Sequence, residues 1–257
     1  MNIKFTIGII GGNGGMGKAL KNFFSRNSLN VLTSDIGSEL KNKELAEESD
    51  IVILSVPLCE YENVLKDIYA SLKSNGTKLL MDIGSLKSKQ TQLMKKFFKG
   101  PVLPVHPLFG PDKNFASGNT IIFCNENTEN DKIKFMENIF IKNGLKTVKM
   151  SPKEHDELMS YIHSFYYFIN IAYLKLLNKK FGKIEDIDKF ATASFQNFKD
   201  NLKNIFNTPS WLIETIIFEN PFLNERKKDF IDILNTDSNA NKELIEEVIK
   251  FAKNHKN

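Results

Sequence analysis

The sequence FTIGIIGGNGGMGKAL (residues 5–20) begins with an apolar run, continues through a cluster of glycines and ends in an amphipathic pattern. This order is typical of a β-strand, a tight turn and an α-helix. Gly12, Gly14 and Gly17 have the spacing of a dinucleotide-binding loop, in which small residues let the backbone approach a pyrophosphate at the helix N-terminus. A purely structural glycine-rich turn is the alternative interpretation.

An acidic residue follows at the distance that such a loop requires. Asp35 directly follows the next apolar run, 18 residues after Gly17. A carboxylate at this place accepts hydrogen bonds from an adenosine ribose and repels a 2′-phosphate, and no arginine follows it closely. We therefore expect the cofactor NAD rather than NADP, with Asn13 and Met16 as further cofactor contacts within the loop.

Seven apolar runs divide the first 150 residues, and most are separated by amphipathic segments. The runs are residues 5–10, 30–34, 51–57, 77–83, 101–106, 120–124 and 145–150. Continuous apolar strands that alternate with helices are typical of a parallel sheet covered on both faces. We predict an α/β fold in residues 1–150, with a Rossmann-like, mostly parallel, doubly wound sheet that binds NAD.

The pattern changes after Met150. SPKE (151–154) is a capping box with proline at the first helical position, and only helical periodicity follows it. Residues 151–257 are therefore predicted to form an all-helical domain. Residues 158–177 are apolar nearly all round, so one layer of helices cannot cover them, and we expect this domain to form a homodimer.

Composition excludes several other classes. The chain has 257 residues, 41% hydrophobic and 26% charged, with a formal net charge of +4 and no dense basic block, so nucleic acid is not an expected partner. Residues 158–174 lack charged side chains but contain several polar ones and are too short for a membrane span of roughly 20 residues. The N-terminus lacks the features of a signal peptide, which favours the cytoplasm. Cys59 and Cys124 have no metal-ligand spacing, and we expect no metal.

Three further motifs end predicted strands. Ser55 and Pro57 in SVPLCEY (55–61) either line the path to the nicotinamide or simply end a strand. Ser85 in DIGSLKS (82–88) either caps a helix or lies in the ligand-binding crevice. His106 in LPVHPLFGPD (103–112) lies between two prolines that fix its direction, and its alternative is a core histidine bonded to the backbone.

In this order and at these spacings, GGNGGMG, SVP, DIGSLKS and especially HPLFGPD resemble the prephenate dehydrogenase family of tyrosine biosynthesis. SPKEHD, at the start of the helical region, also resembles it. The similarity covers the nucleotide-binding half and extends more faintly to about residue 221. HPLFGPD is the specific element, because many dehydrogenases share the glycine motif.

The resemblance implies oxidative decarboxylation of prephenate to 4-hydroxyphenylpyruvate, with hydride transferred to NAD. His106 would accept the proton of the C4 hydroxyl, and Ser85 would orient that imidazole or the nicotinamide amide. Arogenate, which carries an amino group in place of the keto group, stays open as the substrate. A regulatory protein that binds a dinucleotide without turnover is the other alternative, although it has no need for the pair of His106 and Ser85.

Two departures from the family concern the helical half. Lys203 stands where the family usually has an arginine that holds a substrate carboxylate, six residues before Pro209, and the chain has only two arginines. His163 lies one residue before the family's position, and Tyr167 replaces a later histidine. Both are candidate substrate contacts, with a packed helix residue as the alternative for His163. The remaining histidines, His155 and His255, are expected at the surface.

Overall fold

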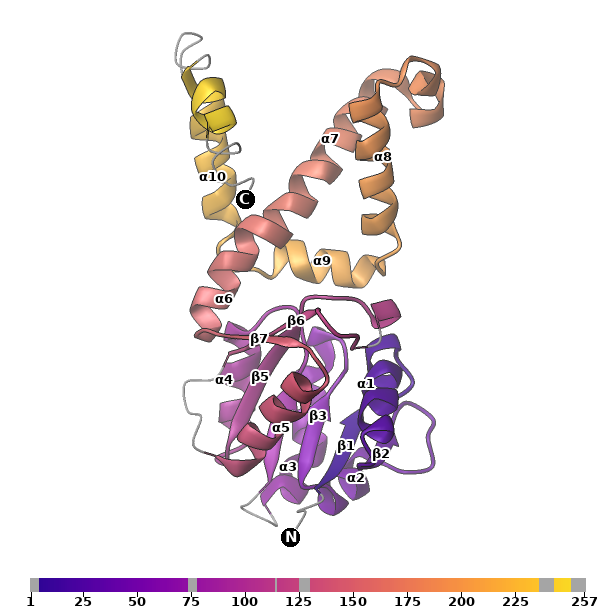
Figure 1. The fold of residues 1–257 in the computed structure, drawn as a ribbon, viewed down its shortest axis with the longest axis vertical. Coiled ribbons are helices and arrows are strands. Elements are labelled where there is room, and N and C mark those ends of the chain that lie inside the picture. The colour runs from indigo at the N-terminus through magenta and orange to yellow at the C-terminus, as the bar shows by residue number, and fades with distance from the viewer. Residues whose placement is uncertain (1–4, 74–77, 114, 125–129, 236–242, 251–257) are drawn as a thin grey trace.

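The computed structural model describes residues 5–73, 78–113, 115–124, 130–235 and 243–250. A seven-stranded sheet forms the lower half of the molecule in Figure 1. Its strands are β1 (Thr6–Ile10), β2 (Asn30–Ser34), β3 (Ile51–Leu54), β4 (Leu79–Asp82), β5 (Val102–Pro107), β6 (Thr120–Phe123) and β7 (Lys146–Lys149). Each predicted apolar run contains one strand, apart from Pro107, which extends β5 one residue beyond its run.

The order across the sheet is β2-β1-β3-β4-β5-β6-β7. Neighbouring strands are parallel except β5 and β6, which pair antiparallel. The prediction of a mostly parallel sheet is therefore confirmed. β1 lies between β2 and β3, so the direction of the chain's progress through the sheet reverses at β1, and ligands bind at such a switch point.

Helices cover both faces of the sheet. They are α1 (Gly15–Arg26), α2 (Asn42–Glu48), α3 (Tyr61–Lys73), α4 (Ser88–Phe97) and α5 (Asp131–Lys142). Ile7 and Ile9 of β1 point into the core that contains side chains of α1 and α5, whereas Ile10 points into the core with α2, α3 and α4. Alternate side chains of a strand face opposite ways, so two cores on two faces explain the continuous apolar strands.

The second half is helical, as predicted. Its elements are α6 (Pro152–Met159), a π-helical turn η3 (Ser160–Phe165), α7 (Tyr166–Phe181), a 3₁₀ segment η4 (Ile184–Phe190), α8 (Ala193–Phe206), α9 (Ser210–Phe218) and α10 (Leu223–Leu234). The predicted capping box begins α6: Ser151 Oγ accepts from the Glu154 N–H at 3.2 Å, and Glu154 Oε2 accepts from the Ser151 N–H at 2.8 Å. In Figure 1, α7 and α8 form one arm above the sheet and α10 forms another.

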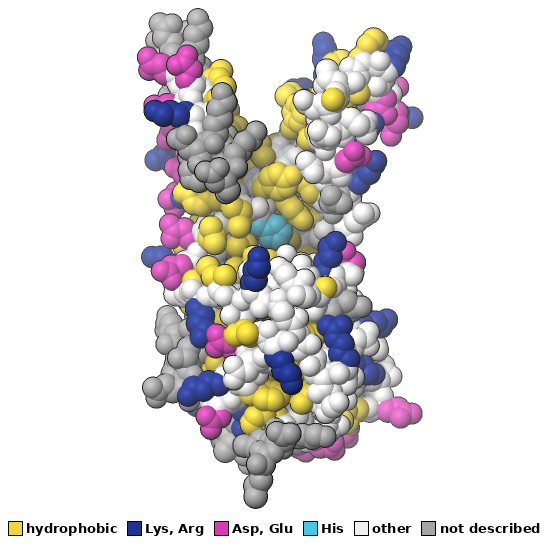
Figure 2. All heavy atoms as spheres, in the orientation of Figure 1, with side chains coloured by type: hydrophobic (Ala, Val, Ile, Leu, Met, Phe, Trp, Pro, Cys, Tyr) yellow, Lys and Arg dark blue, Asp and Glu magenta, His cyan; other side chains and the backbone are white. Residues whose placement is uncertain are grey.

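Apolar side chains remain exposed on these arms. α7 has no buried residue, and Leu176 is 62% exposed. Figure 2 shows hydrophobic side chains along the facing sides of the two arms and a histidine at the base of the notch between them. Among the described residues, no helix is long and apolar enough to cross a membrane.

Candidate active site

The glycine loop lies at the carboxyl end of β1 and begins α1. Gly11 has a φ of +86°, a conformation that favours glycine, and so the left-handed residue directly precedes the three predicted glycines. A Cβ on Gly17 would lie 2.1 Å from the Gly11 carbonyl oxygen, and one on Gly12 would lie 2.6 Å from Thr33 Cβ. The loop therefore accepts no side chain at these positions, and the backbone forms the cradle.

Asp35 lies directly beside this loop. Its Oδ2 accepts a hydrogen bond from the Asn13 N–H at 2.7 Å, and its Oδ1 accepts from the Ile36 N–H, also at 2.7 Å. The carboxylate at the end of β2 and the glycine loop after β1 thus form one edge. A backbone cradle at a helix N-terminus with an adjacent acidic residue fits a dinucleotide whose adenosine ribose carries a 2′-hydroxyl and no 2′-phosphate.

The other cofactor candidates surround the same edge. The Ser55 carbonyl lies so close to Gly11 that a Cβ there would approach it to 2.3 Å. Pro57 directly precedes the short 3₁₀ helix η1 (Leu58–Glu60), Gly14 is the N-cap of α1, and Met16 packs on the adjoining core. The structure brings together the loops on which these predicted residues lie.

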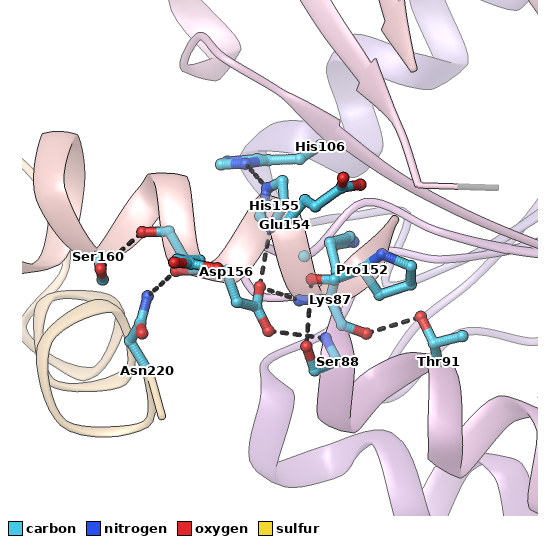
Figure 3. A network of polar contacts seen from close by, with 12 residues as sticks. Lys87, Ser88, Thr91, His106, Pro152, Glu154, His155, Asp156, Ser160 and Asn220 are labelled. Atoms are coloured by element: carbon cyan, nitrogen blue, oxygen red, sulfur yellow. Dashed lines mark hydrogen bonds and ion pairs between the residues drawn. The ribbon is translucent and has the colours of Figure 1, made fainter. Parts of the chain in front are cut away.

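His106 lies near the carboxyl end of β5, at the same edge of the sheet, and its side chain is buried. Its Nδ1 is 2.8 Å from Nε2 of His155, a residue of α6 (Figure 3). The partner of the imidazole is therefore a side chain from the helical half of the chain. Among the described residues, no hydrogen bond joins Ser85 to His106, and the partner that orients the ring is His155.

The expectation that His155 lies at the surface is wrong, because its side chain is 0% exposed. α6 packs with one face toward the sheet half, and this face carries His155, Asp156 and Met159. The spacing of four between His155 and Met159, just after a clear helix start, is the sequence signal for that face. His255 lies outside the described residues.

Asp156 connects the two halves. His155 Nδ1 lies 2.8 Å from Asp156 Oδ1, and the same carboxylate accepts from the backbone N–H groups of Lys87 and Ser88, each at 2.8 Å. Lys87 is the N-cap of α4 and Ser88 is its first residue, so a carboxylate from another helix stabilises the N-terminus of α4. Ser85, for which a capping role was the alternative, does not cap α4.

Burial raises the pKa of the Asp156 carboxyl. Hydrogen bonds from His155, Ser88 and Lys87 outweigh that effect and hold this pKa below its ordinary value. Asp156 is therefore an anion in the folded protein.

A buried ion pair lies beneath His106. Lys87 Nζ is 2.6 Å from Asp82 Oδ2 and donates to the Val105 carbonyl at 2.7 Å, and both charged side chains are fully buried. Tyr61 donates its hydroxyl to the same Asp82 oxygen at 2.9 Å. Burial and the neighbouring Asp82 raise the pKa of Tyr61 well above its usual value, so it remains a donor.

The surroundings of His106 keep its ring neutral. Burial lowers its pKa well below 6.5, and His155, Lys87 and His163 lower it further. The His163 ring is stacked at 6.3 Å from His106 between centroids, with 15° between their planes. Burial, assisted by His155, lowers the pKa of His163 to about 4. A neutral imidazole can accept a proton, as a general base must.

Of the three predicted substrate contacts, His163 lies against His106, and Tyr167 lies against His163. Tyr167 contacts His163 edge-on, with ring centroids 4.8 Å apart. Lys203 of α8 instead pairs with Asp200 at 2.8 Å, and both side chains are exposed. Among the described residues, no hydrogen bond or ion pair joins Lys203 to His106, His155 or His163. Sequence reasoning missed His155, Asp156 and Lys87, although their motifs were recognised.

Two family models match consecutive parts of the chain. Residues 14–149 match the nucleotide-binding domain of prephenate dehydrogenase, and residues 151–253 match the dimerization domain of the same family. A probable arogenate/prephenate dehydrogenase of Methanocaldococcus jannaschii is 27% identical over 280 residues, which cover 99% of this chain and 61% of that protein. The chain spans about three-fifths or less of the length of the curated relatives that it matches.

Solved structures show the same fold. The prephenate dehydrogenase of Aquifex aeolicus, in complex with hydroxyphenyl propionate and NAD⁺, is similar with a TM-score of 0.79 and 18% identity, covering 99% of this chain and 96% of that chain. The arogenate dehydrogenase of Synechocystis is similar with a TM-score of 0.69 and 14% identity, covering 97% and 98%. With both halves matched in order, the chain belongs to the prephenate dehydrogenase family.

Proposed function

We propose that this chain is an NAD-dependent dehydrogenase that converts prephenate to 4-hydroxyphenylpyruvate by oxidative decarboxylation. The observation that carries the proposal is the neutral, buried imidazole of His106 at the sheet edge that also holds the glycine loop. Membership of the family and the NAD⁺ bound by the Aquifex aeolicus structure support it.

The glycine loop and Asp35 hold the cofactor. The backbone amides at the start of α1 would hold the pyrophosphate, and the Asp35 carboxylate would bind the adenosine ribose and disfavour a 2′-phosphate. NAD, when bound, supplies the acceptor for a hydride. The protein's own task is therefore to position the substrate and to move one proton.

His106 moves that proton. Its Nε2 accepts the proton of the substrate's C4 hydroxyl while the C4–H bond breaks and the hydride leaves. The bond from the ring to its carboxylate then breaks, carbon dioxide leaves, and the electron pair makes the ring aromatic. The oxygen takes the proton back from His106, so the protein ends the cycle in its initial protonation state.

Three side chains are proposed to hold the substrate. His163 stacks on His106, and Tyr167 contacts His163, so both can donate a hydrogen bond to a substrate bound at His106. The pKa of about 4 keeps the His163 imidazole neutral, with one N–H to donate. Lys203 is proposed to bind a substrate carboxylate, with weaker geometry than an arginine fork. Lys203→Ala should raise the Michaelis constant for prephenate and leave NAD affinity unchanged, and Lys203→Arg should equal or improve on the wild type.

The helical half is proposed to form a homodimer. Its exposed apolar side chains, such as Leu176 at 62% exposure, support this assembly, as does the match to a dimerization domain.

Arogenate is the second candidate substrate. Both an arogenate/prephenate dehydrogenase and an arogenate dehydrogenase are similar to this chain. The deciding experiment follows NADH absorbance with prephenate and arogenate side by side, each with NAD and NADP. Turnover of prephenate with NAD supports the proposal. Turnover of arogenate alone would make arogenate the substrate in place of prephenate. NAD binding without turnover of either compound favours a regulatory protein.

A further inference from the structure

The proposed base and two further groups form a buried row. His106 is 5% exposed, His155 is 0% exposed and Asp156 is 1% exposed. His106 Nδ1 lies 2.8 Å from His155 Nε2, and His155 Nδ1 lies 2.8 Å from Asp156 Oδ1 (Figure 3). The row begins in the sheet half and ends in the helical half.

The positions of the protons follow from this network. The ionised Asp156 can only accept, so His155 Nδ1 carries a proton. The other nitrogen of neutral His155 is then an acceptor, so the proton between the two rings belongs to His106 Nδ1. His106 Nε2 is consequently free of hydrogen. Both rings therefore hold the Nδ1–H form, the less favoured form of free histidine.

We infer that His155 and Asp156 are positioning residues that complete a closed proton relay with His106, an inference that rests on the proposed function. When His106 Nε2 takes the substrate's proton, its Nδ1 proton passes to His155 Nε2. His106 is then neutral again, and His155 is an imidazolium whose Nδ1–H still donates to the Asp156 carboxylate. Return of the proton reverses both transfers, and no other bond changes.

The surrounding charges favour this transfer. The titratable groups that face His106 are the cationic Lys87 and the imidazoles of His155 and His163. Burial and all three of these neighbours lower the pKa of His106. His155 faces Lys87 as well, but it also faces the carboxylates of Asp156 and Asp82, which raise its pKa against the effect of burial. A positive charge is therefore better accommodated on His155 than on His106.

The reaction itself needs no exit for the proton. Hydride loss, release of carbon dioxide and aromatisation consume and produce no net proton, because the hydroxyl proton returns to the same oxygen. The row from His106 to Asp156 is buried, so a proton taken from the substrate stays within the protein. It is then returned to the same oxygen, as this reaction requires.

The first test does not depend on catalytic activity, because it measures where the protons lie on the two imidazole rings. A solid-state ¹⁵N spectrum of the wild-type protein labelled only at its four histidines should show His106 and His155 protonated at Nδ1 at neutral pH, with signals assigned by their loss in His106→Asn and His155→Gln. A proton on Nε2 of either ring would overturn the relay.

The second test separates orientation from proton transfer. In His155→Gln the amide oxygen can accept from His106 Nδ1, so His106 keeps its tautomer, but the side chain cannot take a proton, and turnover falls. In His155→Leu the acceptor is gone, His106 shifts to the Nε2–H form, and turnover falls further, toward the loss on the order of 10²–10⁴-fold expected for the base itself. Michaelis constants for NAD and substrate should stay unchanged in both.

Ser151→Ala is the matched control, because it removes the cap of the same helix without touching the row. It should lower the melting temperature and leave turnover per folded molecule unchanged. If His155→Leu behaves like Ser151→Ala, the relay is refuted. If the wild type turns over neither substrate, the proposed function fails, and the tautomer measurement still decides the relay.

Discussion

The sheet half and the helical half of this molecule differ in how far their apolar side chains are buried. Every residue of β3 and β4 is buried, whereas α7, with apolar side chains on all sides, buries none. The cofactor edge, which comprises the glycine loop and Asp35, is complete within the sheet half. The histidine cluster, which comprises His106, His155 and His163, needs both halves. A change in the helical half can therefore reach the chemistry, while the cofactor edge stays intact.

The largest effect is expected where the halves meet. His106→Asn should lower turnover by about 10²–10⁴-fold, because the positioned base is lost. Asparagine can still form hydrogen bonds and nearly fills the space, so the melting temperature and NAD affinity should change little. Turnover and melting temperature are measured on one sample. Lost stability with normal turnover per folded molecule would make His106 a structural residue.

The exposed arm of the helical half gives the next effect. Leu176→Asp should dissociate the proposed dimer, since burying a leucine stabilises by about 1.5–3 kcal/mol and each dimer contains two copies. Ile141→Asp on α5, where the isoleucine is 49% exposed, is the control in the sheet half and should leave the dimer intact. Sedimentation at micromolar concentration checks both. A dimer that survives the first change would place the interface elsewhere.

The cofactor edge offers a smaller effect. Asp35→Ser should reduce the preference for NAD over NADP by roughly tenfold. The change removes the repulsion between the Asp35 carboxylate and the 2′-phosphate of NADP, whose free energy is about that of one charge-assisted hydrogen bond. The ratio of kcat/KM for the two cofactors measures it. His106→Asn should leave the affinities for both cofactors unchanged, because His106 belongs to the histidine cluster and not to the cofactor edge. An unchanged ratio would remove Asp35 from the ribose site.

The last expected effect concerns stability rather than turnover, assembly or cofactor choice, and it is the dependence of stability on pH. The pKa values of His106, His155 and His163 are all lowered by folding, so the unfolded chain binds more protons as the pH falls below about 6.5. Stability should be greatest above this pH and decrease toward pH 4, by at most about 1.4 kcal/mol per pH unit for each group. Thermal melts across this range measure the slope, and His163→Leu should make it shallower. A flat profile would show that these rings are not buried neutral.

Contiguous motifs explain why so much of the sheet half could be predicted. Buried parallel strands are apolar throughout, so each run contains its strand, and the spacing from Gly17 to Asp35 is local. The start of α6 was equally readable from SPKE. The burial of His155 was not, because it depends on how α6 packs against the sheet half. The pairing of Lys87 with Asp82 also escaped prediction, since a charged motif is ordinarily solvated.

The contact between Asp156 and the first turn of α4 has a mechanical consequence. Its carboxylate is fastened by two backbone amides of the sheet half, while its own carbonyl accepts from Asn220 of the helical half. A hinge rotation that separated the halves would pull Asp156 from those amides and draw His155 away from His106. The contact that joins α6 to the start of α4 therefore also aligns the proposed base, and any displacement of one half relative to the other would misalign His106.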